Sequence, residues 1–125
     1  MLGSKARFTH YDHLSHLAVE AKVFGKYAGR GHLVFNASEG PEIVNLEVRS
    51  RFQGLGIGKK LLHFLINEAK SRKATRLFLS VWNQSTPALH LYESVGFRAI
   101  REEMLPSVRW PTPRCMIKME LQLAS

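Results

Sequence analysis

A glycine-rich run at residues 53–59, Gln-Gly-Leu-Gly-Ile-Gly-Lys, separates an apolar segment at 42–49 from an amphipathic helical segment at 58–72. Its three glycines remove side chains where the backbone must approach another group closely. A helix that begins there directs its free N–H groups to the same place, which favours a bound phosphate. Residues 76–82 then form a second apolar segment of strand length. The unit therefore predicts a parallel strand pair joined by a right-handed crossover helix, which excludes all-helical and purely antiparallel folds.

Four further segments are expected to form strands on either side of this unit, because each is rich in strand-forming residues and bounded by turn residues. They are residues 16–24, 32–36, 97–105 and 114–123. Turns are expected at 29–31 and 38–41, whereas residues 1–14 have no firm period. Short hairpin connections between neighbouring strands predict antiparallel pairing outside the central unit.

A second, shorter helix is expected after residue 82. Asn83, Ser85 and Thr86 are suitable helix caps, Pro87 suits a first turn, and Gly96 suits the position just after the helix ends. The expected order is strand-strand-strand-helix-strand-helix-strand-strand. The fold class predicted from this order is α/β, with a mixed, largely antiparallel twisted sheet, a central parallel strand pair and flanking helices.

Length and composition are those of one globular domain over residues 1–125. No apolar run approaches the roughly 18–20 residues that cross a membrane, and residues 1–8 lack the apolar core of a secretory signal. The single cysteine, Cys115, cannot form an internal disulfide and is expected in a strand core. We therefore expect a cytoplasmic protein without a membrane partner.

The formal net charge of +8 indicates an anionic partner. A polyphosphorylated cofactor and a nucleic acid both fit this charge, and so does a solvated basic face without a partner. Basic residues gather beside the glycine run and after the long helix, at Arg49, Arg51, Lys59, Lys60, Lys70, Arg72, Lys73 and Arg76. Because the chain lacks an RNA-binding signature and interleaved surface aromatics, a nucleic-acid partner is the less favoured reading.

The register of the glycine run excludes two familiar phosphate motifs. A Walker loop needs a glycine where Gln53 stands and a serine or threonine where Lys60 stands. A dinucleotide fingerprint needs a third glycine where Lys59 stands. The run therefore belongs to another kind of phosphate-binding loop, or is a tight turn between strand and helix.

The residues from Gln53 to Gly58 resemble motif A of the GNAT superfamily of acyl-CoA N-acyltransferases, which runs Gln/Arg-x-x-Gly-x-Gly/Ala. A second block, Asn83 followed by Ala-Leu-His-Leu-Tyr-Glu-Ser-Val-Gly-Phe at 88–97, looks like the family's motif B. Residues 46–52 resemble its usual lead-in to motif A. The resemblance covers roughly residues 40 to 100. It implies a GNAT fold, a single N-acetyltransferase domain and acetyl-CoA as the acyl donor, with no metal.

The resemblance also implies which residues hold the donor. The loop amides would bind the coenzyme A pyrophosphate at the helix N-terminus, and backbone groups of two strand residues would pair with pantetheine. The Val48 N–H would lie near the thioester carbonyl and polarise it. Asn83 resembles the asparagine of motif B that contacts pantetheine, although a helix cap is an equal alternative. The full set of expected donor-binding residues is Leu46, Val48, Gln53, Gly54, Leu55, Gly56, Ile57, Gly58, Lys59 and Asn83.

Two residues are expected to carry the chemistry. By resemblance, the Tyr92 hydroxyl donates a proton to the departing thiolate; a tyrosine half-buried against the sheet is the alternative. Glu42 stands where several family members place a base, and an exposed carboxylate at a strand edge is its alternative. It has the same strand parity as Val44, Leu46 and Val48, so these side chains are expected to share one face, opposite to Glu47. Some acetyltransferases of peptide N-termini carry glutamate where this chain has Ser80.

The acceptor of the acyl group is not readable from this chain. The resemblance implies a strand and two helices that form one acceptor wall, whereas only residues 1–15 precede the first expected strand. Arg109 and Trp110 lie in the loop before the last strand, where they either grip an acceptor or pack the loop. The shortened N-terminal part leaves sheet edges free, so a homodimer is plausible. It also leaves a catalytically idle acyl-CoA-binding module as the alternative to an enzyme that acetylates a primary amine.

A metal site is conceivable only if residues 10–16 are helical. His10, His13 and His16 recur at every third position, which would place them on one helical face. Because this stretch has no fixed period and nothing else in the chain needs a metal, we expect none.

Overall fold

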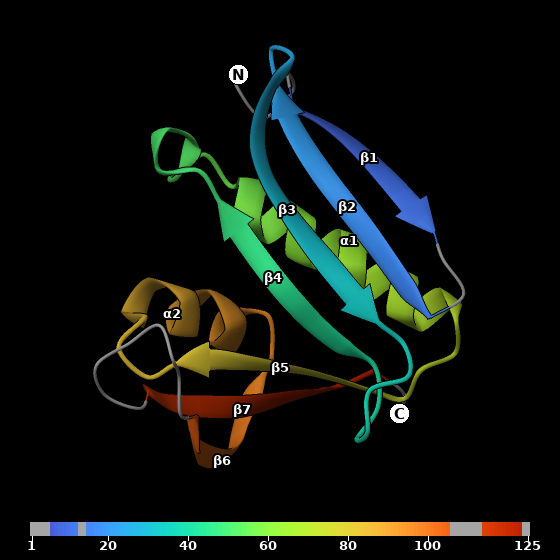
Figure 1. The fold of residues 1–125 in the computed structure, drawn as a ribbon, viewed down its shortest axis with the longest axis vertical. Coiled ribbons are helices and arrows are strands. Elements are labelled where there is room, and N and C mark those ends of the chain that lie inside the picture. Colours follow the sequence, from blue (N-terminus) through green and yellow to red (C-terminus); the bar gives the residue numbers. More distant parts are fainter. Residues whose placement is uncertain (1–5, 13–14, 106–113, 124–125) are drawn as a thin grey trace.

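The structure, a computed structural model, describes residues 6–12, 15–105 and 114–123. A seven-stranded sheet runs through the described residues in the order β1-β2-β3-β4-β5-β7-β6 (Figure 1). Neighbouring strands are antiparallel except for β4 and β5, which form the parallel pair that the sequence predicts. The strands are β1 (Ala6–Asp12), β2 (His16–Val23), β3 (Lys26–Val34), β4 (Glu42–Val48), β5 (Arg76–Trp82), β6 (Arg98–Leu105) and β7 (Arg114–Gln122).

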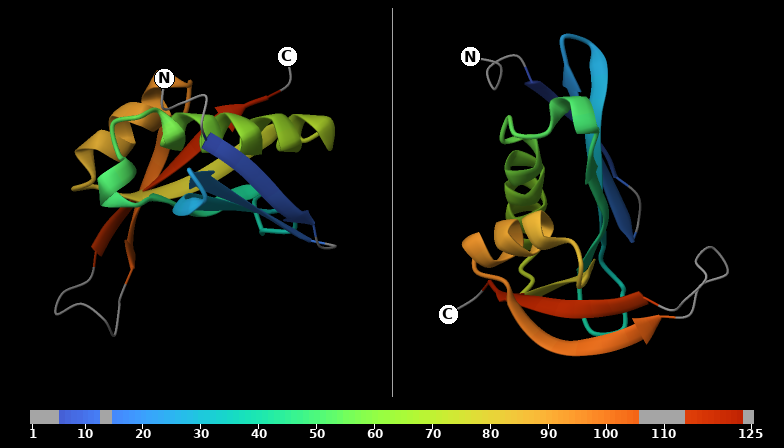
Figure 2. Two further views of the ribbon diagram at one scale, coloured as in Figure 1. Left: turned by 90° about the horizontal axis from the view of Figure 1, so that it is seen from above. Right: turned by 90° about the vertical axis from the view of Figure 1, so that its left-hand side faces the viewer.

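Among the described residues, the sheet is accompanied by the helices α1 (Ile57–Ser71) and α2 (Thr86–Ser94) and by a short 3₁₀ turn at Ser50–Phe52. Helix α1 lies along the β2–β4 part of the sheet, and α2 lies beside β5 (Figures 1 and 2). The apolar side chains of α1 recur at helical spacing and are buried against the sheet, where each leucine and isoleucine contributes roughly 1.5–3 kcal/mol. They are Ile57, Leu61, Leu62, Leu65, Ile66 and Ala69.

Most of the predicted elements are confirmed to within a few residues, namely β2, β4, α1, β5, α2, β6 and β7. Gly96 has a φ of 107° and follows the last residues of α2, as expected of a glycine just beyond a helix. Cys115 lies in β7, where it is only partly buried rather than a core residue.

The expectation that the first strand begins at residue 16 is wrong, because Ala6–Asp12 forms β1 and pairs with β2. Only Ala6 and Phe8 of this strand are partly buried, and its other side chains are exposed. An edge strand that buries so little has no alternating apolar pattern to reveal it.

The predicted turn at 29–31 is also wrong, because β3 begins at Lys26 and runs through both glycines. A Cβ atom at Gly29 would lie 2.6 Å from the Glu47 carbonyl oxygen, and one at Gly31 would lie 2.9 Å from Leu65 of α1. These glycines therefore allow close packing of β3 against β4 and α1. The chain reverses instead at Phe24 and Gly25, where φ is 51° and 78°.

A β-bulge in β4 changes which side chains face α1. Asn45 has a φ of 54°, and the pairing of β3 with β4 shifts register at this point. Ile43 is buried in the core on the α1 side, and Leu46, three positions later, lies beside Leu65 of α1. The expectation that Glu42 shares a face with Leu46 and Val48 is therefore wrong, because the bulge places it on the opposite face.

Strands β4 and β5 pair only at their beginning, where Glu42 lies opposite Phe78 and Ile43 opposite Leu79. Beyond this point the two strands diverge, with α2 beside the opening (Figure 1). Backbone groups of β4 that face β5 are therefore without a strand partner after Ile43. Within the described ranges, no helix is both long and apolar enough to cross a membrane.

Candidate active site

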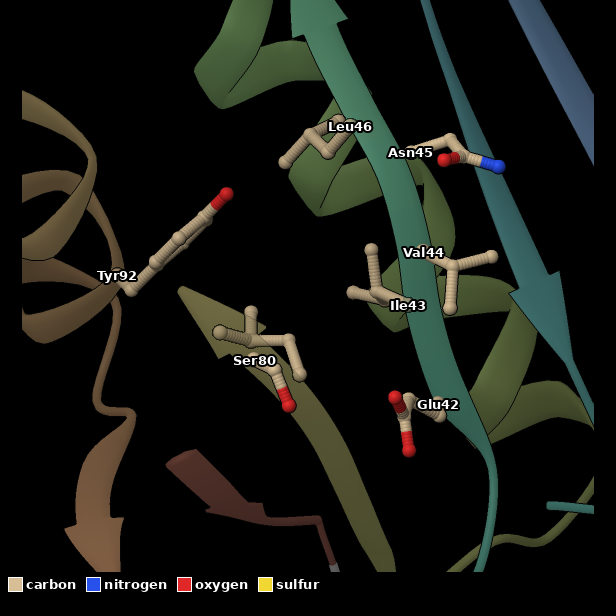
Figure 3. A pocket seen from close by; sticks show the side chains of 8 residues that line it. Glu42, Ile43, Val44, Asn45, Leu46, Ser80 and Tyr92 are labelled. Carbon is tan, nitrogen blue, oxygen red and sulfur yellow. The ribbon is translucent and has the colours of Figure 1, made fainter. Parts of the chain in front are cut away.

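Two pockets meet where β4 and β5 diverge. The larger, about 710 Å³, extends from the upper half of β4 across the glycine loop to α2. The smaller, about 230 Å³, lies between the lower half of β4 and Leu79 and Ser80 of β5 (Figure 3). Leu46 and Tyr92 line both pockets, so the two spaces communicate at these side chains.

The glycine loop forms one end of the larger pocket. Gly54 and Gly56 have φ values of 81° and 83°, and a Cβ atom added at either would meet nothing within 4 Å. The loop backbone therefore faces open space in a left-handed conformation that favours glycine. Helix α1 starts directly after Gly56, with no side-chain cap and no acidic residue in its first turn. Its first N–H groups are thus available to an anion such as a pyrophosphate.

Eight of the ten residues expected to bind the donor line the larger pocket. They are Leu46, Val48, Gln53, Gly54, Gly56, Ile57, Gly58 and Lys59. Leu55 instead packs against the apolar core. Asn83 lines neither pocket: its N–H donates to the Cys115 carbonyl, and its side-chain oxygen accepts a hydrogen bond from Gln84.

The backbone of Val48 is directed into the opening. The Arg49 N–H donates to the Ala28 carbonyl, and Val48 lies opposite Gly29 in the same antiparallel pair. Because hydrogen-bonded and non-hydrogen-bonded pairs alternate, the N–H and C=O of Val48 point away from β3. The Gln53 amide donates to this carbonyl at 3.0 Å, which leaves the Val48 N–H for a ligand.

Tyr92 projects from α2 toward β4, with its hydroxyl directed to the region of Leu46 (Figure 3). The residue is 8% exposed, and its ring lies edge-on to Phe97 with centroids 6.0 Å apart. Burial raises the pKa of the Tyr92 phenol above its usual value of 10. The phenol therefore keeps its proton at neutral pH, in a position where both pockets can reach it.

Glu42 stands at the beginning of β4 and lines the smaller pocket together with Ser80 and Tyr92. Its side chain extends from β4 toward β5 (Figure 3). The Oε1 atom accepts a hydrogen bond of 2.7 Å from Nζ of Lys118 on β7. Glu42 and Tyr92 thus line the same pocket from two different elements, β4 and α2.

Sequence reasoning missed two groups of residues around the site. The role of Lys118 could not be predicted from the sequence, because only the pairing of β7 with β5 brings this lysine to Glu42. Helix α2 contributes a wall to the larger pocket through Pro87, Ala88 and Leu91, together with Ser85 just before the helix. The spacing of Pro87, Ala88 and Leu91 with Tyr92 places them on one helical face, a signal that the sequence does carry.

A metal site formed by His10, His13 and His16 would require residues 10–16 to form a helix. His10 instead lies in β1 and His16 in β2. His10 packs against the Phe64 ring, and His16 Nε2 lies 2.7 Å from His32 Nδ1. Across residues 6–12, 15–105 and 114–123, no three histidine, cysteine, aspartate or glutamate side chains are grouped to hold a metal ion. His13 and the predicted loop residues Arg109 and Trp110 lie outside the described residues.

Known proteins share this sequence pattern. Residues 3–97 match the family described as "Acetyltransferase (GNAT) family". A curated relative, the [ribosomal protein bS18]-alanine N-acetyltransferase of Haemophilus ducreyi, is 45% identical over 58 residues. That match covers 46% of this chain and 40% of the relative, so this chain corresponds to less than half of the relative's length.

Solved structures share the fold along nearly the whole chain. The IAA acetyltransferase from Bacillus cereus has a TM-score of 0.82 and 23% identity, with 94% of this chain and 99% of that chain covered. A GNAT family acetyltransferase from Elizabethkingia anophelis, solved with acetyl-CoA bound, has a TM-score of 0.78 and 22% identity over 95% of this chain and 99% of that one. At such identities the likeness establishes the fold alone. Together with the match over residues 3–97, it shows that the chain belongs to the GNAT family of acetyltransferases.

Proposed function

We propose that the chain is an N-acetyltransferase that transfers the acetyl group of acetyl-CoA to a primary amine by direct attack in a ternary complex. The observation that carries this proposal is the meeting of the two pockets at Leu46 and Tyr92. One pocket ends at the glycine loop, and the other contains the Glu42 carboxylate. A donor and an acceptor can therefore approach the same tyrosine from opposite sides.

The larger pocket suits coenzyme A. The uncapped N-terminus of α1 and the open backbone at Gly54 and Gly56 favour its pyrophosphate. The outward-facing Val48 N–H would donate a hydrogen bond to the thioester carbonyl of the bound donor. The Elizabethkingia anophelis protein of the same fold was solved with acetyl-CoA bound, which supports the same co-substrate here.

During the reaction the attacking amine must lose a proton and the departing thiolate must gain one. The amine nitrogen forms a bond to the acetyl carbon while the bond from that carbon to sulfur breaks. In our proposal the amine proton passes to the Glu42 carboxylate, directly or through water, and the Tyr92 hydroxyl gives its proton to the departing thiolate. Exchange with solvent then returns Glu42 and Tyr92 to their starting protonation states.

Among amine acceptors, a peptide N-terminus is the first to test. The Haemophilus ducreyi relative is named for acetylation of an alanine of ribosomal protein bS18, and the corresponding peptide is therefore a defined substrate candidate. Small primary amines, polyamines and lysine side chains complete the panel, because the smaller pocket presents a carboxylate and apolar walls that suit an aminoalkyl group.

The proposal is tested by thiol release from acetyl-CoA over this panel, together with calorimetric titration of acetyl-CoA into the protein. We expect binding of acetyl-CoA and amine-dependent thiol release. Gly58→Leu should weaken acetyl-CoA binding at least about tenfold, because the side chain would fill the cleft between Val48 and Leu91. Gly58→Ala is the matched control, since its Cβ would make only ordinary contacts at 3.5 and 3.7 Å.

Two results would contradict the proposal. Binding of acetyl-CoA without thiol release for any amine would indicate an acyl-CoA-binding module instead of an enzyme. Absence of binding, or equal binding by the Gly58→Leu variant, would remove the larger pocket as the donor site.

A further inference from the structure

Lys118 is an almost buried cation on β7, and its partners lead into the smaller pocket. Its side chain is 9% exposed, and its Nζ donates to Glu42 Oε1 at 2.7 Å. The same Nζ lies 3.9 Å from a carboxylate oxygen of Glu39 and 5.7 Å from the centre of the buried Phe78 ring. We propose that Lys118 is a positioning residue that holds the Glu42 carboxylate in place for the acceptor amine, an inference that rests on the function proposed above.

The sheet register produces this arrangement. Glu42 lies opposite Phe78 on β5, and two positions further along β5 Ser80 lies opposite Lys118 on β7. Residues two apart on a strand, and residues paired across strands, share one face of a sheet. Glu42, Ser80 and Lys118 therefore converge on the face opposite to α1. The lysine stem crosses Phe78 and brings its ammonium to the edge of the smaller pocket.

A second carboxylate completes the surroundings of the Lys118 ammonium. Glu39, in the connection before β4, accepts hydrogen bonds from both terminal nitrogens of Arg101 on β6. These hydrogen bonds hold the pKa of Glu39 below its usual value. The chain of side chains Arg101, Glu39, Lys118 and Glu42 thus alternates in charge and ends at the pocket that also contains Tyr92.

Stability alone is a weak reason for such a pair. Removing an ammonium and a carboxylate from water costs free energy that their attraction recovers only partly, and an apolar pair is often as stable. A neighbouring pair on the same sheet face joins Glu120, which is 12% exposed, to Arg76, which remains 51% exposed. The Lys118 pair differs from it in the burial of its cation, which is 9% exposed, and in its contact with a pocket-lining carboxylate.

The hydrogen bond from Lys118 restricts the Glu42 side chain while leaving Oε2 for another partner. A glutamate without such an anchor samples several rotamers, and only a fraction of them direct the carboxylate at the pocket. Misplacement of a reacting group by about 1 Å can lower a rate by about 100-fold. Lys118 therefore acts on the acetyl transfer through Glu42, without itself contacting the reacting atoms.

The test uses the full chain and steady-state kinetics with a responsive acceptor from the amine panel. Lys118→Met keeps the aliphatic stem and removes the ammonium. We expect kcat to fall about 10- to 100-fold while the KM for acetyl-CoA changes less than about twofold, because the donor cleft does not include Lys118. Lys118→Arg should restore part of kcat. Arg76→Met is the matched control and should leave kcat unchanged.

A double-variant cycle separates positioning from a general structural effect. If Lys118 acts through Glu42, Glu42→Gln combined with Lys118→Met should lose no more kcat than Glu42→Gln alone. Additive losses, or full kcat in Lys118→Met, overturn the inference. Should Lys118→Met not fold, Lys118→Leu, which likewise lacks a donor to Glu42, takes its place in the same cycle. A wild-type chain that acetylates no amine overturns the proposed function and this inference together, whereas an active wild type with an undiminished Lys118 variant overturns this inference alone.

Discussion

Tyr92 shows how burial and access are combined in one side chain. Its ring packs against Phe97, yet its hydroxyl lies at the junction of two pockets. Burial disfavours the phenolate and so keeps the proton on the oxygen. A proton donor must remain protonated until the thiolate departs, and this environment meets that requirement.

The substitution Tyr92→Phe should therefore lower kcat about 100-fold or more, because general acid catalysis typically contributes about 10²- to 10⁴-fold. The KM for acetyl-CoA should change little, since phenylalanine preserves the packing with Phe97. Tyr11→Phe is the control for loss of a phenol, because Tyr11 is 64% exposed on β1, away from both pockets. Unchanged kcat in the Tyr92 variant would remove this residue from the acid role.

At the scale of elements, β4 is the strand that organises the site. Asn45 adopts a left-handed conformation, which a non-glycine residue other than asparagine or aspartate adopts at a cost of about 1–2 kcal/mol. The bulge allows the lower half of the strand to present Glu42 on one face and the upper half to present Leu46 and Val48 on the other. One strand thereby lines both pockets.

Replacement of the bulge residue tests this role. Asn45→Val should reduce the free energy of unfolding by about 1–2 kcal/mol, because a β-branched residue resists a φ of 54°. Asn45→Gly should be within about 0.5 kcal/mol of the wild type, since glycine accepts this conformation. Urea denaturation of the three proteins measures the difference. Equal stability of the valine and glycine variants would show that the bulge tolerates any residue.

The accuracy of the sequence-based predictions differs from one element to the next. Helix α1 and strand β5 follow strong apolar patterns, so both were predicted with nearly correct ends. Strand β1 was not predicted because it buries too few side chains to show an apolar pattern. The glycines of β3 were mistaken for a turn because glycine is favoured both at chain reversals and where strands and helices pack closely. The face of Glu42 was mispredicted because alternation assumes an unbroken strand, and the bulge at Asn45 has no sequence signal of its own. Its ion pair with Lys118 depends on register, which local patterns do not specify.

At the scale of the whole molecule, the face of the sheet opposite to α1 carries His32, which lies beside His16 and whose protonation is expected to affect stability. Burial, with further contributions from His16 and Arg30, lowers the pKa of His32 below 6.5. The unfolded chain therefore binds a proton at His32 more readily than the folded chain does. Stability from this residue is present above about pH 6.5 and is lost as the pH falls below that value.

Thermal unfolding between about pH 8 and pH 5 checks this expectation. The Tm of the wild type should fall on acidification, and His32→Gln should reduce the slope because it removes the group whose pKa differs between the two states. His63→Gln on the exposed side of α1 is the control and should keep the wild-type slope. A slope that is identical in all three proteins would exclude His32 as a source of acid sensitivity.

The short pairing of β4 with β5 has a mechanical consequence. Only Glu42 and Ile43 of β4 are matched in register with β5. The sheet therefore consists of two parts, β1–β4 with α1 and β5–β7 with α2, that are joined along a narrow seam (Figure 2). We expect a hinge motion of these two parts about the seam to be the easiest deformation of the sheet. A ligand bound between β4 and α2 would contact both parts of the sheet at once. We therefore expect occupancy of the site to stiffen the sheet across this seam.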